Sequence, residues 1–260
     1  MRYETHHSVV EHHGPNPVGG KRGGPGRNQA RWPRSRYFEG TNGADNLIGN
    51  GGNHVLFALG GMDNLVGAEG KDWVLGGNER RAFGGDKNLV GGPGNDGING
   101  GVGSDTVLGG AGNDYLIGDN GSDRAVVGGE GKDIVSGSYG SDNVVGGSGT
   151  DFVTDGPLDD TRKDTLSGGA GDDVLQLDNY PKTKDIVSCG RGLDRVVVDR
   201  KDVVRPDCEK VWVVHGTEAE VMEQENAFYE SVPPGVSKFF DFAHPFENFF
   251  EEQLAPDPVG

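Results

Sequence analysis

The chain contains no uninterrupted apolar run that approaches the roughly 20 residues of a transmembrane helix. Its first residues, MRYETHHSVVEHHG, also lack the apolar core of about 7–15 residues that marks a secretory signal peptide. We therefore expect neither a membrane span nor an N-terminal signal peptide.

Basic side chains and catalytic motifs are scarce as well. The chain has 24 Lys and Arg residues against 41 Asp and Glu residues, which gives a net charge of -17. An acidic surface repels phosphate groups, so we expect no nucleic-acid partner. The sequence shows no nucleophile–base pair, no His-Glu-x-x-His motif and no phosphate-binding loop, so we expect no enzymatic activity.

Glycine, in contrast, is abundant, with 48 residues, and much of it follows a nine-residue repeat. The segment from Gly91 to Ile117 reads GGPGNDGIN, GGVGSDTVL, GGAGNDYLI, or Gly-Gly-x-Gly-x-Asp-x-apolar-x. The frame runs from Gly40 to about Val197. Its sixth position holds Asp45, Asp63, Asp72, Asp96, Asp105, Asp114, Asp123, Asp133, Asp142, Asp151, Asp164, Asp173, Asp185 and Asp194.

This period predicts an all-β fold, a right-handed parallel β-roll or β-solenoid with two units per coil. Glycine adopts positive φ without steric cost, so the first six positions suit a tight turn, and the last three suit a short strand. The apolar residue at position eight should point inward. We interpret residues 76–90 as two shortened units, and we expect loops at residues 155–162 and 177–184 and one inserted residue around 125–127.

The aspartates predict a cation. In a stack of coils, equivalent aspartates lie about 4.8 Å apart and repel one another. Ca²⁺ between them would turn these carboxylates into ligands, with turn carbonyls completing an all-oxygen shell. Each coil offers only two inward apolar residues, so we expect folding to depend on Ca²⁺.

The repeat resembles the haemolysin-type, or RTX, calcium-binding repeats over residues 40–197. The resemblance implies a Ca²⁺ cofactor, export to the cell surface or the extracellular space, and ions bound between successive coils. One turn would give the carbonyls of positions two and four and its Asp, and the next turn the carbonyls of positions one and three and its Asp. The first implied site joins Gly92, Gly94 and Asp96 to Gly109, Ala111 and Asp114, and the second joins Gly101, Gly103 and Asp105 to Gly118, Asn120 and Asp123. A third joins Gly110, Gly112 and Asp114 to Gly128, Glu130 and Asp133. The pairs Asp123/Asp142 and Asp133/Asp151 extend the two series of stacked aspartates, one on each side of the coil.

The flanks differ from the repeat in composition. Residues 1–39 are basic and His-rich, and we expect them to be disordered. Residues 198–215 suit a cap over the end of the solenoid. Residues 216–260 form an acidic, Phe-rich tail that either docks or remains disordered.

The two cysteines, Cys189 and Cys208, bracket the end of the repeat. A disulfide between them would hold the cap and indicate an oxidising compartment, and two free buried thiols are the alternative.

The function we expect is that of a calcium-binding structural module, secreted or on the cell surface. One alternative is an adhesion or ligand-binding solenoid, in which Trp73, Tyr115, Tyr139 and Phe152 contact a cell-surface or cell-wall component. Another is a fragment or accessory part of a larger secreted enzyme or toxin. The sequence does not indicate an oligomeric state.

Overall fold

Two parallel β-sheets form the main body of the described structure. The computed structural model describes residues 35–77, 88–157, 160–177, 179, 183–216 and 218–232. Disorder was expected for residues 1–39; residues 1–34 lie outside these ranges, whereas residues 35–39 form a strand. The Phe-rich part of the tail from residue 233 onward also lies outside them. Residues 1–213 and 214–260 are separate units, and each is described by itself.

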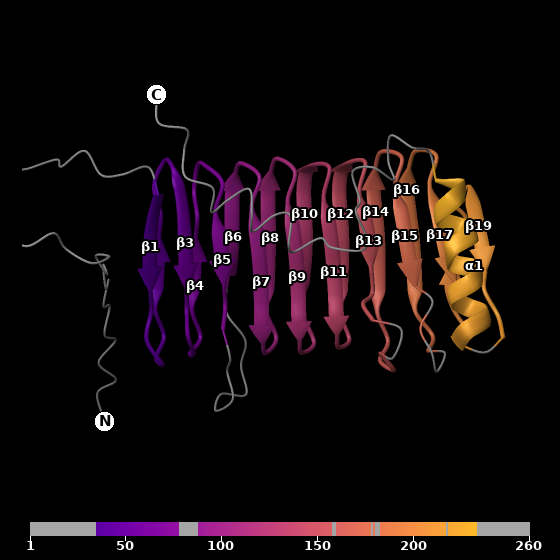
Figure 1. Cartoon of the computed structure of the whole chain (residues 1–260), viewed down its shortest axis with the longest axis horizontal. Coiled ribbons are helices and arrows are strands. Elements are labelled where there is room, and N and C mark those ends of the chain that lie inside the picture. Colours follow the sequence, from indigo (N-terminus) through magenta and orange to yellow (C-terminus); the bar gives the residue numbers. More distant parts are fainter. Residues whose placement is uncertain are drawn as a thin grey trace, which may run out of the picture. The chain divides into compact units, whose positions relative to one another are not determined.

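The strands of the first unit alternate between the two sheets in chain order, so each coil contributes one strand to each sheet (Figure 1). Within the described residues, the ten-stranded sheet contains β1 (Ser35–Glu39), β3 (Asn53–Phe57), β5 (Trp73–Leu75), β7 (Gly97–Val102), β9 (Tyr115–Asn120), β11 (Ile134–Tyr139), β13 (Phe152–Thr154), β15 (Val174–Leu177), β17 (Arg195–Val198) and β19 (Lys210–Val213). The nine-stranded sheet contains β2 (Asn46–Ile48), β4 (Asn64–Val66), β6 (Asn88–Pro93), β8 (Thr106–Ala111), β10 (Ala125–Gly131), β12 (Asn143–Gly149), β14 (Thr165–Ala170), β16 (Ile186–Arg191) and β18 (Val203–Val204). The predicted parallel β-solenoid with two units per coil is confirmed.

The core is the single file of position-eight side chains. Strand side chains alternate between faces, so the middle residue of each short strand points inward. In every unit from β2 to β17 this residue is at most 2% exposed. The file comprises Leu47, Leu56, Leu65, Val74, Leu89, Ile98, Val107, Leu116, Val126, Val135, Val144, Val153, Leu166, Leu175, Val187 and Val196.

The pairing register corrects our interpretation of residues 76–90. Leu65 pairs with Leu89 and Val74 pairs with Ile98, so both pairs are 24 residues apart instead of 18. This segment is therefore one unit with six additional residues, not two shortened units. Its Gly84-Gly85-Asp86 sequence resembles the start of a second unit, although the spacing accommodates only one unit.

The other predicted insertions agree with the register. Asp105 and Asp123 are equivalent at a spacing of 18, whereas Thr106 pairs with Ala125 at a spacing of 19. The single extra residue is therefore Arg124, just before the predicted position. The spacing then lengthens to 22 across residues 155–162 and to 21 across residues 177–184.

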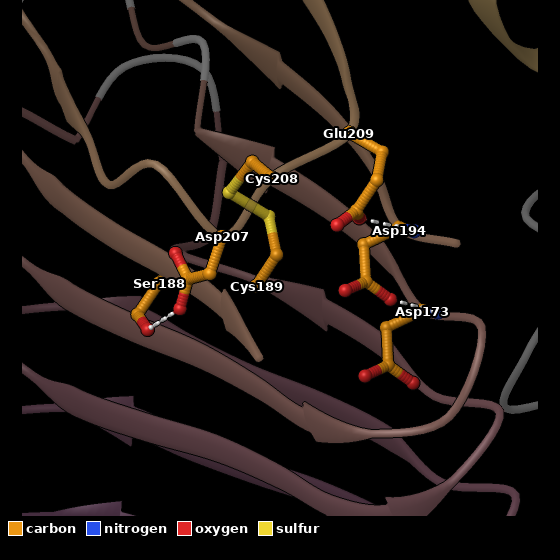
Figure 2. Close-up of a disulfide and its surroundings, with 7 residues drawn as sticks. All are labelled: Asp173, Ser188, Cys189, Asp194, Asp207, Cys208 and Glu209. Carbon is orange, nitrogen blue, oxygen red and sulfur yellow. Dashed lines mark hydrogen bonds between the residues drawn. A yellow bond between two sulfur atoms is a disulfide. The ribbon is translucent and has the colours of Figure 1, made fainter. Parts of the chain in front are cut away.

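The end of the first unit continues both sheets. Strands β18 and β19 pair in parallel with β16 and β17, so residues 198–213 form a terminal coil of shortened spacing. Cys189 in β16 and Cys208 before β19 form a disulfide, as predicted, and the Ser188 hydroxyl donates a hydrogen bond to Asp207 beside it (Figure 2).

The second unit contains one described helix, α1 (Glu218–Ser231), which the sequence analysis did not predict. Val221 and Phe228, two turns apart on one face of this helix, are both buried. No helix in the described part of the chain is long and apolar enough to cross a membrane.

Two of the four aromatic residues considered for partner contact are not exposed. Trp73 and Phe152 stand at position seven, beside the inward residue, and are only 7% and 6% exposed. Tyr139 is 38% exposed. The expectation that Trp73 and Phe152 present an open binding surface is therefore wrong.

Candidate metal centres

The position-six residues form two rows, one before each sheet. Row A precedes the strands of the ten-stranded sheet, and row B precedes those of the nine-stranded sheet. Row A contains, among described residues, His54, Asp72, Asp96, Asp114, Asp133, Asp151, Asp173, Asp194 and Glu209. Row B contains Asp45, Asp63, Asp105, Asp123, Asp142, Asp164, Asp185 and Asp202.

Each row is held by a repeated hydrogen bond between coils. The backbone N–H of Asp96 donates to Oδ1 of Asp114 at 2.8 Å, and that of Asp114 donates to Oδ1 of Asp133 at 2.9 Å. In row B the N–H of Asp105 donates to Oδ1 of Asp123 at 2.8 Å. One carboxylate oxygen per residue is therefore used to fix the register of the turns.

The second carboxylate oxygen has no protein partner in most of these residues. Oδ2 is buried without a hydrogen bond in Asp72, Asp96 and Asp114, and in seven further position-six aspartates of the described residues. A buried carboxylate oxygen without a partner carries a desolvation cost of several kcal/mol or more, of the order given for uncompensated buried charges. Such an atom indicates a missing ligand or proton.

Glycine at position one leaves room for this oxygen. A Cβ on Gly109 would lie 2.5 Å from Oδ2 of Asp114 and 2.5 Å from the carbonyl oxygen of Gly128 in the next coil. The oxygen of one coil and the carbonyl of the next thus converge where any larger residue would clash.

Carbonyl groups from both neighbouring turns face each gap. The carbonyls of Gly92 and Gly94, at positions two and four, lie against Gly110 and Gly112 of the following coil. The carbonyl at position three points the other way, because Ala111 O accepts a hydrogen bond from Gly94 N–H at 2.7 Å. Carbonyl groups of both turns therefore lie between successive coils, in the same turns that hold the unpartnered carboxylate oxygens.

The structure brings the sequence-predicted residues together in the expected pairs of turns. Gly92, Gly94 and Asp96 face Gly109, Ala111 and Asp114 in row A through the contacts just described. In row B, Gly103 N–H donates to Asn120 O at 2.9 Å, and the carbonyl of Gly118 lies 2.5 Å from the Cβ position of Gly100. The pairs Asp123/Asp142 and Asp133/Asp151 are adjacent members of their rows.

This donor set fits a hard cation. No group of three or more His, Cys, Asp or Glu side chains in the described ranges makes a ready metal cluster. A cation in a gap would therefore take most of its ligands from carbonyl oxygens and the rest from two carboxylates, which is the oxygen chemistry that Ca²⁺ prefers.

Burial also changes the pKa values of the carboxyl groups in the two rows. It raises the pKa of the Asp96 carboxyl from 3.8 to about 8, and the negative charges of Asp114 and Asp72 add to this rise. The same cause raises the pKa of Asp151 and Asp164 to about 8, of Asp114 and Asp142 to about 7, and of Asp123 and Asp133 to about 6. Without a cation, these turns therefore favour protons.

Two row members were missed in the sequence. Asp185 N–H donates to Oδ1 of Asp202 at 3.0 Å, and Asp194 N–H donates to Oε2 of Glu209 at 3.1 Å (Figure 2 shows the second pair). The signal was present, since Asp202 and Glu209 each stand two residues before a valine, as position six stands before position eight. The lack of glycine in these turns hid it.

Comparison with known families supports the same chemistry. The model of the RTX calcium-binding nonapeptide repeat matches four segments, residues 39–74, 90–125, 126–154 and 160–179. No curated protein matches the chain with significance.

Asp114 tests the site geometry, because it faces Asp96 on one side and Asp133 on the other. We expect Asp114→Asn to remove charge from two gaps and to weaken Ca²⁺ binding more than Asp63→Asn, which alters the single described pair with Asp45. Calorimetric Ca²⁺ titration of both variants measures the difference. Equal losses would contradict the arrangement of shared ligands.

The raised pKa values predict an inverted pH dependence of the metal-free protein. The folded-state pKa of these carboxyls, about 6 to 8, exceeds the unfolded value near 4, so the folded state binds more protons between these pH values. In EDTA, the free energy of unfolding should be largest in acid and decline as the pH rises from 6 to 8. Urea unfolding followed by circular dichroism measures it, with saturating Ca²⁺ as the control in which the decline disappears. Greater metal-free stability at pH 8 than at pH 5 would refute the expectation.

Proposed function

Because residues 39–179 of this chain are an array of RTX calcium-binding repeats, which bind Ca²⁺, we propose that the protein is a secreted or cell-surface structural module whose folding is coupled to calcium. The observation that carries the proposal is the pair of carboxylate rows with their buried, unpartnered Oδ2 atoms. In this role the β-roll is a scaffold that supplies length and stiffness.

The coupling follows from the small core. Each coil buries two position-eight side chains, while the turns between them bury two carboxyl groups. Ordering a coil opposes a large conformational entropy, and burying unpaired charge adds to that cost. A ligand that binds only the folded turns stabilises the fold by mass action, so Ca²⁺ supplies what the apolar core does not.

The proposed location outside the cell is supported by two features. The Cys189–Cys208 disulfide is of the kind that persists in oxidising compartments. Calcium sites of extracellular modules bind with dissociation constants of about 10⁻⁴–10⁻³ M, so such a module folds where calcium is plentiful.

Chelation tests the calcium coupling. In EDTA at pH 7.5, we expect the full-length chain to lose most of its β-sheet circular dichroism, and millimolar Ca²⁺ should restore it cooperatively. Mg²⁺ at the same concentration is the matched control, because Mg²⁺ requires a tighter octahedral shell and should not restore the signal. Unchanged β content after chelation would overturn the calcium-coupled folding.

The state of the cysteines tests the proposed location. In protein isolated from its source cells without reductant, mass spectrometry should find Cys189 and Cys208 joined. Alkylation with iodoacetamide before and after reduction provides the control. Two alkylated cysteines before reduction would contradict a secreted or surface location, while leaving calcium binding untouched.

A further inference from the structure

Among the gaps of row A whose side chains on both sides are described, the first lies between His54 and Asp72, and it differs from the others. In this register the backbone of Arg36 in β1 pairs with His54. His54 holds position six, where the members that follow it in row A are acidic. The gap therefore contains one carboxylate instead of two.

The imidazole of His54 occupies the place of the missing carboxylate oxygen. In the ordinary gap, Oδ2 of Asp114 lies 2.5 Å from the Cβ position of Gly109. In the first gap, Nδ1 of His54 lies 3.0 Å from the Cβ position of Gly49, the equivalent glycine. The ring nitrogen thus stands where an ion would find its carboxylate ligand.

This nitrogen is already bound to the opposite coil. Oδ1 of Asp72 lies 2.8 Å from the backbone nitrogen of His54 and 2.8 Å from its Nδ1. A ring nitrogen and a carboxylate oxygen at this distance share a proton, whichever group carries it. A proton on this line excludes a Ca²⁺ ion bridging the same two atoms.

The ring is fixed from its other sides. Nε2 lies 3.3 Å from Oδ1 of Asn50, in the same turn, and the ring lies against Phe38 with centroids 5.7 Å apart. The side chains of His54 and Asp72 are 1% and 0% exposed. The hydrogen bond is therefore held in a dry environment in one orientation, where it is stronger than in water.

We propose that the His54–Asp72 hydrogen bond replaces calcium in the first gap, so that the calcium sites of row A begin at the gap between Asp72 and Asp96. The coils that begin with β3 and β5 are joined there without metal. His54 thus sets the N-terminal limit of the calcium sites in row A. The inference rests on the proposed function, because it needs Ca²⁺ in the other gaps.

The decisive experiment counts calcium ions bound to the full-length chain by equilibrium dialysis against ⁴⁵Ca²⁺. His54→Asp restores the second carboxylate and should raise the number by one ion per chain. His54→Asn is the matched control, because Asn has the shape of Asp but offers an N–H donor to Asp72, and it should leave the number unchanged.

Two results would overturn the inference. The first is a His54→Asp variant that binds no more calcium than the wild type. The second is a His54→Asn variant that binds one ion fewer, which would show that the histidine is itself a ligand. Either result leaves the proposed function intact, whereas a wild-type chain that binds no calcium would reject the proposed function.

A second measurement on the wild type does not depend on the folding of a variant. In saturating Ca²⁺, imidazole ¹⁵N NMR should show a hydrogen-bonded proton shared by Nδ1 of His54, and its signal should not move with further Ca²⁺. An Nδ1 without this proton in the calcium-loaded protein would overturn the inference.

Discussion

The stacking of like-charged carboxyl groups at one strand spacing is the constraint on which this structure depends. Most described turns bury an aspartate that accepts a backbone N–H with one carboxylate oxygen and leaves the other without a hydrogen bond. Electrostatics alone would separate such coils. The same turn also places carbonyl groups between successive coils, so one nine-residue unit supplies both the repelling carboxylates and the further oxygen ligands that a cation requires. Protons in acid and Ca²⁺ near neutrality are two ways to neutralise the same row.

Much of the fold could be predicted because a single residue per strand, at position eight, forms the core and recurs at a readable interval. Leu116 and Val135 remain identifiable although Arg124 shifts the frame between them. The spacing of residues 76–90 could not be predicted, because a second Gly-Gly-Asp sequence there imitates a unit, and only strand pairing shows which glycines belong to a coil. Helix α1 begins at Glu218 within the sequence Thr217-Glu218-Ala219-Glu220, a Thr-x-x-Glu pattern that commonly begins helices.

The sequence predicted which residues form the central candidate sites, but it did not predict where the rows of carboxyl groups begin and end. The motif identifies Asp96 and Asp114 as neighbours from spacing alone. It does not show that Glu209 continues row A without glycines, or that the ring of His54 faces Asp72 instead of solvent. Where a row begins and ends depends on the direction of the side chains and on the hydrogen-bonding groups of the adjacent coil. The repeat pattern in the sequence contains neither kind of information. The burial of Trp73 and Phe152 was unpredictable for the same reason. Alternation along a strand predicts on which face of the sheet a side chain lies, but not whether other residues cover it there.

A solenoid in which each coil touches only its neighbours can be peeled from an end one coil at a time. The Cys189–Cys208 bond (Figure 2) limits that route at one end to β19, because it links β16 to the chain between β18 and β19. A pulling force applied at Val213 would be carried through the two sulfur atoms to β16 before the strands between them could separate. The array is thus a rod with one covalently anchored terminus, suited to bear tension from that side.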